Sequence, residues 1–134
     1  MSGNQAQMTY NKLDLLKLMY LSREGDRREG VLLRQGKGWF QVAGMGHEPL
    51  AVLAMLLRDD DYLFPYYRDR AMMLAKGMTN LELATAYFAK QASTSGGRQM
   101  PGHYSNRSKN VWSVPTPTGA SLLPACGVAF ACSK

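Results

Sequence analysis

Two short stretches of this chain concentrate side chains that can bind an anion and move a proton. The first is Phe64-Pro65-Tyr66-Tyr67-Arg68-Asp69-Arg70, and the second is Arg98-Gln99-Met100-Pro101-Gly102-His103-Tyr104. A planar guanidinium such as that of Arg68 can hold two phosphate oxygens, and the Tyr67 hydroxyl can donate another hydrogen bond. The imidazole of His103, beside an anionic substrate, can orient a carboxylate or transfer protons.

Each of these residues also has a purely structural interpretation. Arg68 and Arg70 can pair with Asp69 and other acids on a solvated helix, and loop carbonyls can satisfy His103. From the residues alone, the structural interpretation is favoured for Arg68, and the two interpretations are balanced for His103. The pair His47-Glu48, in Gly46-His47-Glu48, is better explained by helix capping than by metal binding or acid–base chemistry.

Composition and motifs argue against several other classes of site. The two histidines and two cysteines do not match a zinc site, and Cys126 and Cys132 are expected to be buried structural thiols in a reducing compartment. Gly36-Lys37-Gly38 is too short for a phosphate-binding loop. No serine has the context of a nucleophile elbow, and no metal site is predicted within these residues.

Charge and hydropathy narrow the class of protein further. The net charge is +6, and from Gln91 onward the chain has basic residues but no acid. These basic residues are scattered and form no helical stripe, so a nucleic-acid-binding module is disfavoured. No run of about twenty apolar residues predicts a membrane span, and the polar start Met1–Gln5 lacks the apolar segment of a signal peptide. We therefore expect a cytoplasmic chain of one domain at most.

The first elements that must position these residues are predicted from capping and turn signals. Asn11 is a plausible N-cap for a long helix that begins directly after it. Gly25 and Gly30 predict a bend or interruption in that helix. Residues 36–38 form the turn that ends it, and residues 39–42 form a short extended stretch.

The middle of the chain is predicted to hold three more helices. Residues 50–57 are apolar nearly all round, which is typical of a helix buried on most sides. Residues 62–64 read as a short strand or extended arm, and residues 67–76 as a helix. Thr79 then caps a fourth helix, with Glu82 completing a capping box.

The rest of the chain is predicted to be a long ordered loop followed by a final helix. Residues 91–117 are irregular, but apolar side chains such as Trp112 argue against disorder. Residues 119–132 predict a buried helix that Pro124 kinks or restarts. Residues 1–10 are expected to be flexible. The prediction is therefore a mostly α-helical chain with one or two short strands.

The combination of motifs resembles the alpha subunit of the decarboxylating component of thiamine-diphosphate-dependent 2-oxo-acid dehydrogenases, from Leu13 to Cys132. Gly97-Arg98-Gln99-Met100-Pro101-Gly102-His103-Tyr104 is nearly the family consensus, and Tyr67-Arg68-Asp69 resembles its Tyr-Arg pair. The branched-chain (2-oxoisovalerate) type is the most similar, including forms with alpha and beta regions fused in one chain. The resemblance implies an α/β thiamine-diphosphate-binding fold for the complete family member.

The resemblance also implies two groups of site residues. The cofactor-binding group is Tyr67, Arg68, Thr116 and Thr118, and the substrate-pocket group is Phe40, Met100 and His103. His103 is expected to be catalytic. The implied reaction is oxidative decarboxylation of a 2-oxo acid with acyl transfer to lipoyl. The implied partners are a beta subunit or fused beta region and a lipoyl-bearing acyltransferase.

Two departures from the family pattern qualify this resemblance. Ala120 and Ser121 replace a Thr-Gln pair associated with a structural potassium ion, which is therefore not expected. The family's Gly-Asp-Gly motif, which anchors Mg²⁺ with a downstream Asn, is absent up to Lys134. Residues 11–134 are therefore expected to be the N-terminal part of a thiamine-diphosphate-binding domain, inactive alone, with apolar helices near Leu50 and Leu122 exposed. The alternative is a non-catalytic docking or assembly module derived from the same fold.

Overall fold

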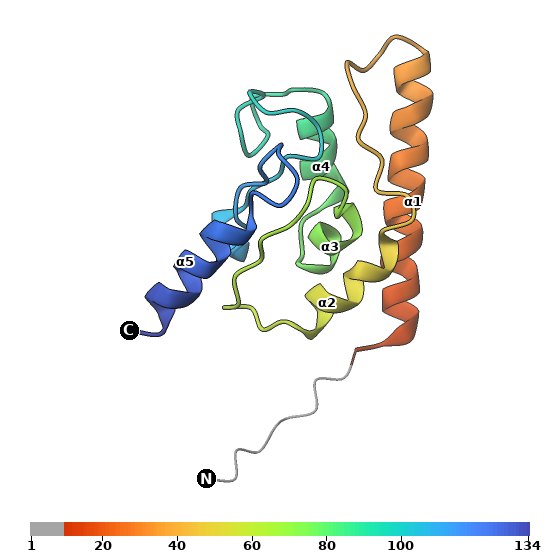
Figure 1. The fold of residues 1–134 in the computed structure, drawn as a ribbon. Coiled ribbons are helices and arrows are strands. Elements are labelled where there is room, and N and C mark those ends of the chain that lie inside the picture. Colours follow the sequence, from red (N-terminus) through yellow and green to blue (C-terminus); the bar gives the residue numbers. More distant parts are fainter. Residues whose placement is uncertain (1–9) are drawn as a thin grey trace.

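The computed structural model describes residues 10–134, so all but the last residue of the predicted flexible segment 1–10 lies outside it. The chain is mostly helical, as predicted (Figure 1). The elements are α1 (Lys12–Arg34), the 3₁₀ helix η1 (Glu48–Leu50), α2 (Ala51–Leu56), α3 (Arg70–Ala75), α4 (Asn80–Tyr87), the 3₁₀ helix η2 (Arg107–Lys109) and α5 (Leu122–Cys132). Within residues 10–134, no helix is both long enough and apolar enough to cross a membrane.

The long helix α1 is capped as predicted but is not interrupted. The Asn11 side chain accepts a hydrogen bond from the backbone nitrogen of Leu13 at 2.8 Å. The helix continues through Gly25 and Gly30, so the predicted interruption is not formed. Gly25 serves a different purpose, because a Cβ there would lie 2.4 Å from the guanidinium of Arg70. The absence of a side chain at Gly25 therefore leaves room for the buried Arg70 side chain.

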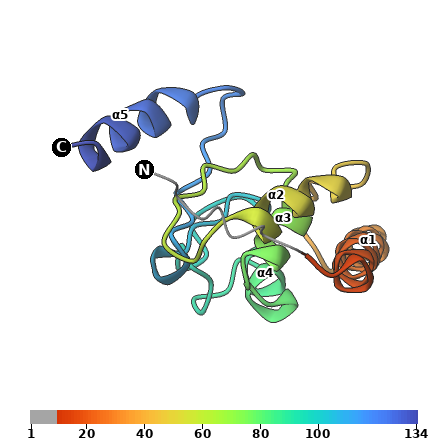
Figure 2. The same cartoon turned by 90° about the horizontal axis from the view of Figure 1, so that it is seen from below.

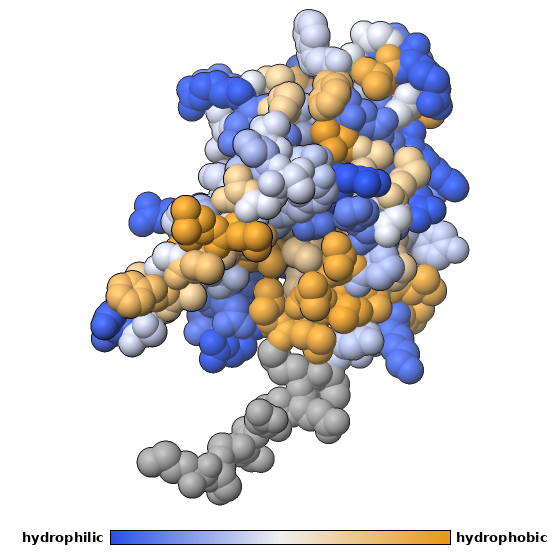
Figure 3. Space-filling model, in the orientation of Figure 1, coloured by the Kyte–Doolittle hydropathy of each residue, from blue (hydrophilic) through white to orange (hydrophobic). Residues whose placement is uncertain are grey.

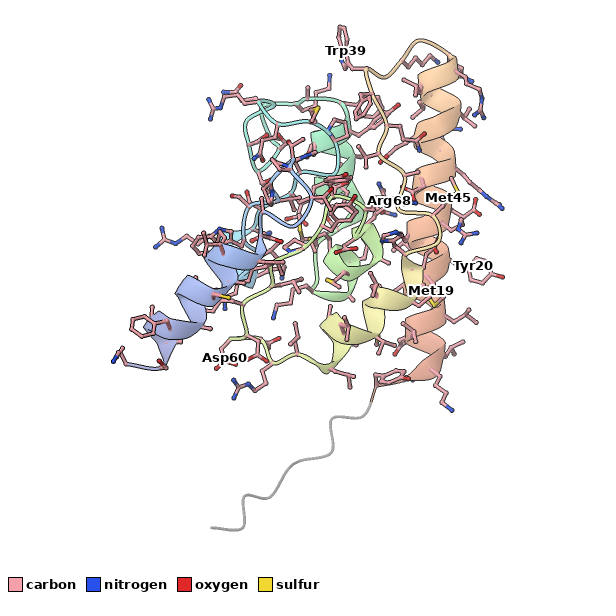
Figure 4. All side chains as sticks on the ribbon, viewed as in Figure 1. Met19, Tyr20, Trp39, Met45, Asp60 and Arg68 are labelled. Carbon is pink, nitrogen blue, oxygen red and sulfur yellow. The ribbon has the colours of Figure 1, made fainter. Side chains whose placement is uncertain are left out.

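The residues that α1 buries are polar. Ser22, Asp26 and Glu29 are buried, whereas large apolar side chains on the same helix are exposed, namely Leu13, Leu16, Tyr20 and Leu21. Figure 4 places Tyr20 on the outer side of α1. The fully buried contacts of α1 with the rest of the molecule are therefore polar, while Leu18 packs partly buried against the apolar core.

The apolar core lies under α2, α3 and α4. Its buried members come from these helices and the loops beside them: Ala54, Leu63, Met72, Met73, Leu74, Met78, Leu83, Ala86, Tyr104 and Val111. Seen from below, α2 and α3 lie between α1 and the loop segments, with α4 beside them (Figure 2). The predicted helix over residues 50–57 is present as η1 followed by α2, but Leu53 is 53% exposed, so this helix is less enclosed than expected.

The one or two short strands that were predicted are not formed among residues 10–134, and the extended segments 39–42 and 62–64 belong to no sheet. Among residues 10–134 the only β-type pairings are isolated bridges, from Val111 to Leu63 and to Asn106. Leu63 donates to the Asn110 carbonyl at 2.9 Å, and Trp112 donates to the Leu63 carbonyl at 2.8 Å. Because the pairing stops there, residues 62–64 are an extended arm rather than a strand.

The helix predicted over residues 67–76 begins later, at Arg70. Asp69 holds the preceding turn, since its carboxylate accepts a hydrogen bond from the Tyr66 backbone nitrogen at 2.8 Å. Tyr67 and Arg68 therefore lie in a turn, not at a helix start. The predicted capping box of α4 is confirmed by reciprocal hydrogen bonds between Thr79 and Glu82.

The final helix α5 forms but is not buried, contrary to the prediction. None of its residues is buried, and Leu122, Leu123 and Phe130 are 70%, 81% and 66% exposed. Figure 2 shows α5 apart from the other helices, and Figure 3 shows its apolar surface facing outward. Cys126 and Cys132 are exposed for the same reason, so the buried-thiol prediction is wrong. The expectation of an apolar surface exposed near Leu122 is confirmed.

Candidate functional site

One pocket of about 410 Å³ brings together most of the residues singled out in the sequence. Phe40, Tyr67, Arg68, Met100, His103 and Thr116 line it, together with residues 41–43. Thr118 is not among its lining residues. The pocket thus draws on four chain segments, and residues 41–43 had no recognisable signal in the sequence.

His103 is buried at the pocket wall, with both ring nitrogens in polar contact. Nδ1 lies 3.1 Å from the Pro101 carbonyl oxygen, and Nε2 lies 3.1 Å from Oγ1 of Thr116. A carbonyl can only accept, so Nδ1 is the donor to Pro101, and in the neutral form of the ring Nε2 accepts from the Thr116 hydroxyl. Both interpretations of His103 are therefore compatible: a loop carbonyl satisfies one nitrogen, and the other is oriented toward a pocket residue.

Aromatic rings continue from His103 along the pocket wall. The rings of Tyr67 and His103 are stacked with centroids 5.4 Å apart, and those of Tyr66 and Tyr67 are 3.9 Å apart. A hydrogen bond between the two tyrosine hydroxyls lowers the pKa of Tyr67 and raises the pKa of Tyr66, and the Thr118 hydroxyl lowers both. A phenol with a lowered pKa is a stronger donor, so Tyr67 is suited to donate to an anion.

Arg68 brings a positive charge that no acid neutralises among residues 10–134. Its Nε donates to the Ala43 carbonyl at 2.9 Å, and its Nη2 donates to the Met45 carbonyl at 3.0 Å. Figure 4 shows Arg68 beside Met45 at the loop next to α1. The predicted pairing of Arg68 with Asp69 is not formed, because Asp69 bonds to the Tyr66 nitrogen instead. The guanidinium is held by carbonyls and keeps its charge for a ligand.

A buried polar cluster lies behind the pocket and had not been anticipated. Nη1 of Arg70 contacts the Glu29 carboxylate at 2.6 Å and lies 3.9 Å from that of Asp26, while Nη2 donates to Asn80 at 3.2 Å. Desolvation raises the pKa of both carboxyls, and Arg70 opposes that rise. The spacing of the two acids on α1 did place them on one helix face. That signal alone did not identify the cation.

Glu48, rather than His47, stabilises the start of η1. His47 occupies the N-cap position of η1 but makes no capping hydrogen bond through its side chain, so of the pair predicted to cap this helix only Glu48 contributes a side-chain bond. The Glu48 carboxylate accepts from the Gly46 backbone nitrogen at 2.8 Å and from Nε of Arg23. The bond from Arg23 is the main reason that the pKa of Glu48 is lowered to about 2.

Replacing Glu48 by Gln is expected to destabilise the chain by about 1–2 kcal/mol at pH 7, because a charge-assisted hydrogen bond to a partly exposed arginine is weakened. The folded pKa lies below the ordinary value of 4.5, so the charged form contributes stability above that value. The difference between wild type and variant should shrink as the pH falls toward about 2. Urea unfolding from pH 7 to pH 2.5 measures it, and a constant difference would contradict the assigned role.

Metal-binding side chains are not grouped in the part of the chain that the structure describes. Across residues 10–134, no three His, Cys, Asp or Glu side chains are placed to hold a metal ion together. What the pocket offers is a cation, hydroxyl donors and an imidazole. This chemistry suits an organic anion.

A family comparison agrees with this chemistry. The sequence profile of the family described as "Dehydrogenase E1 component" matches residues 16–134. The chain belongs to this family. The match extends from within α1 to the end of α5 and includes every residue that lines the pocket.

Individual relatives of this dehydrogenase E1 chain carry the name of the branched-chain type. It is 39% identical over 122 residues to the 2-oxoisovalerate dehydrogenase subunit alpha of Bacillus subtilis (strain 168), covering 89% of this chain and 37% of that protein. It is 34% identical over 98 residues to the mitochondrial 2-oxoisovalerate dehydrogenase subunit alpha 1 of Arabidopsis thaliana, covering 72% of this chain and 21% of that protein. It is 32% identical over 124 residues to the mitochondrial subunit alpha of Bos taurus, covering 91% of this chain and 27% of that protein. The predicted resemblance is confirmed, and the chain spans between 21% and 37% of the length of these relatives.

Proposed function

We propose that this chain is part of the decarboxylating component of a thiamine-diphosphate-dependent 2-oxo-acid dehydrogenase, which oxidatively decarboxylates a 2-oxo acid and passes the acyl group to lipoyl. One observation carries the proposal: a guanidinium without an acid partner, a tyrosine hydroxyl and an oriented histidine meet in one pocket of a dehydrogenase E1 chain. When bound, thiamine diphosphate supplies the electron sink that decarboxylation requires.

Arg68 and Tyr67 are the proposed ligands of the cofactor diphosphate. The two backbone carbonyls that accept from Arg68 fix its guanidinium plane, so little side-chain entropy is lost when an anion binds. The lowered pKa of Tyr67 strengthens its hydroxyl as a donor to phosphate oxygens. Thr116 and Thr118 are proposed to contact the cofactor ring; Thr116 lines the pocket, and Thr118 lies next to Tyr67.

The other end of the pocket is proposed to receive the 2-oxo acid. Phe40 and Met100 are 49% and 45% exposed and line the pocket, where they can cover an aliphatic side chain such as that of a branched 2-oxo acid. His103 is the proposed catalytic residue. Its Nε2, which Thr116 orients, can hold or accept a proton beside the substrate carboxylate.

The described residues fit the diphosphate anion but not its Mg²⁺, because residues 10–134 offer no cluster of metal ligands. We therefore place the magnesium ligands outside these residues and treat residues 11–134 as the N-terminal part of a thiamine-diphosphate-binding domain. The cytoplasmic location stays a prediction, because the Arabidopsis thaliana and Bos taurus relatives are described as mitochondrial.

A beta subunit or fused beta region and a lipoyl-bearing acyltransferase are the proposed partners. The exposed apolar face of α5 supports a covering partner surface, since Leu122, Leu123 and Phe130 all face outward. The same face favours the second candidate function, a non-catalytic docking module. Cofactor binding distinguishes the two, because a docking module has no reason to bind thiamine diphosphate.

Thiamine diphosphate should bind the chain, and Arg68→Gln should weaken that binding by about tenfold or more, because a charged hydrogen bond to phosphate is lost. Isothermal titration calorimetry with Mg²⁺ present measures the affinity. Arg98→Gln is the matched control, since Arg98 is exposed and does not line the pocket. Equal affinities of the two variants, or no binding by the wild type, would contradict the proposed function and favour the docking module.

A further inference from the structure

The pocket segment 41–45 is tied to α1 through a single residue, Asp26. The Gly44 backbone nitrogen donates to the Asp26 carboxylate at 2.8 Å, and the Gln41 side chain donates to the Asp26 carbonyl at 2.6 Å. The carbonyls on either side of Gly44 are the two that accept from Arg68. Asp26, which does not reach the pocket, thus holds the segment that orients a pocket guanidinium.

The charge balance of the buried cluster does not explain why Asp26 is there. Glu29 already contacts Arg70 at 2.6 Å, whereas Asp26 is 3.9 Å away, and its Oδ1 has no hydrogen-bond partner. Asp26 is fully buried, so its charge is costly where it stands. Among residues 10–134, the hydrogen bond from Gly44 is the only one that the Asp26 carboxylate accepts. The presence of Asp26 as a second buried acid is therefore best explained by its hydrogen bond with Gly44.

The packing around Gly44 makes the segment sensitive to this anchor. A Cβ at Gly44 would lie 2.6 Å from the Arg68 carbonyl oxygen, so the two backbones are in close contact. A shift of the segment by a fraction of an ångström therefore changes the position of Arg68 and of both carbonyls that hold it. Loss of a fixed guanidinium orientation weakens recognition of a bidentate anion.

We propose that Asp26 is a positioning residue for the anion-binding site, because its carboxylate fixes Gly44 and thereby the carbonyls that orient the Arg68 guanidinium. The inference rests on the proposed function for its ligand, a diphosphate. The orientation of Arg68 by Asp26 does not require a ligand. It is therefore tested separately from diphosphate binding.

The test uses the 134-residue chain with Asp26→Leu, which fills the space without an acceptor, and Asp26→Asn, which keeps an acceptor oxygen for Gly44. Glu29→Gln is the matched control, since it perturbs the same buried cluster but does not touch the segment. The first readout is the hydrogen-exchange rate of the Arg68 Nε–H group by nitrogen-15 NMR, assigned with Arg68→Lys. The second is the affinity for inorganic pyrophosphate.

Asp26→Leu should accelerate Arg68 Nε–H exchange and weaken pyrophosphate binding by about tenfold each. Asp26→Asn should restore both, and Glu29→Gln should leave both unchanged even where it lowers stability. If Asp26→Leu does not fold, Asp26→Ala takes its place, and the contrast between Asp26→Asn and Glu29→Gln is read in the same way.

Wild-type exchange protection in Asp26→Leu, or loss of protection in Glu29→Gln equal to that in Asp26→Leu, would overturn the inference. If protection follows the expected order but the wild type does not bind pyrophosphate, the positioning role stands and the proposed function fails. If pyrophosphate binds and Asp26→Leu leaves its affinity unchanged, the proposed function stands and the positioning role fails.

Discussion

Replacement of Arg70 by Met is expected to lower the free energy of unfolding by about 3–5 kcal/mol at pH 7. The substitution leaves Asp26 and Glu29 buried without a countercharge, and both are 7% exposed or less. Arg70 itself is 5% exposed, so water cannot take its place without rearrangement. Urea unfolding followed by circular dichroism measures the loss.

The pH dependence of the loss identifies its cause. Without Arg70, the pKa of both acids should rise further above the ordinary range, because desolvation, the largest cause of the rise, is no longer opposed by the arginine charge. A raised folded pKa means that stability is retained below the unfolded pKa and is lost as the pH increases. The deficit of Arg70→Met should therefore shrink toward pH 4 and in the triple variant with Asp26→Asn and Glu29→Gln. Arg28→Met, at an exposed position of α1, is the control; a deficit that does not change with pH would rule out uncompensated charge.

Replacement of Gly102 by Ala is expected to destabilise the chain by about 3 kcal/mol or more. Gly102 has a φ of 82°, and a Cβ there would lie 2.5 Å from the Tyr67 carbonyl oxygen. The loop must then move away from the turn that carries Tyr67 and Arg68, so the stacking of Tyr67 on His103 should be lost as well. Calorimetric unfolding and pyrophosphate titration measure the two effects.

Gly119 provides a matched control for this substitution. Its φ is 81°, nearly that of Gly102, but no atom lies within 4 Å of a Cβ built on it. Gly119→Ala should therefore lower the free energy of unfolding by only about 1 kcal/mol, the cost of a left-handed backbone conformation for alanine. If the two variants are equally stable, the close approach of the loop to the Tyr67 carbonyl is not a significant constraint.

Much of the helical framework was predictable because its signals are local. Asn11 and the pair Thr79 and Glu82 form their capping bonds within three residues, so the sequence pattern contains the whole interaction. The start of α3 was misplaced because Asp69 folds back on Tyr66, which turns the chain before the helix begins. For α5 the composition supported two conflicting expectations, burial of the helix and an exposed surface near Leu122, because apolar composition indicates a need for burial but does not identify what covers it.

The candidate site was predictable where side chains form a sequence motif. It was not predictable where backbone atoms hold a site residue in place. Tyr67, Arg68 and His103 were singled out by a family resemblance that the comparisons confirm, although their roles stay predictions. The carbonyls that hold Arg68 belong to Ala43 and Met45, and a carbonyl has no residue signature. The contact between Glu29 and Arg70 joins residues 41 positions apart, which a local pattern does not contain.

The polar attachment of α1 also determines the register of that helix. An apolar face can slide along a core with a small loss of contact, but directional bonds from Asp26 and Glu29 fit only one placement. A shift by one turn would leave two buried acids and one buried arginine unpaired at once. The helix should therefore detach as a unit rather than slip, and its buried amides should exchange together with those of α3. The position of α1 along its own axis therefore determines where segment 41–45 lies.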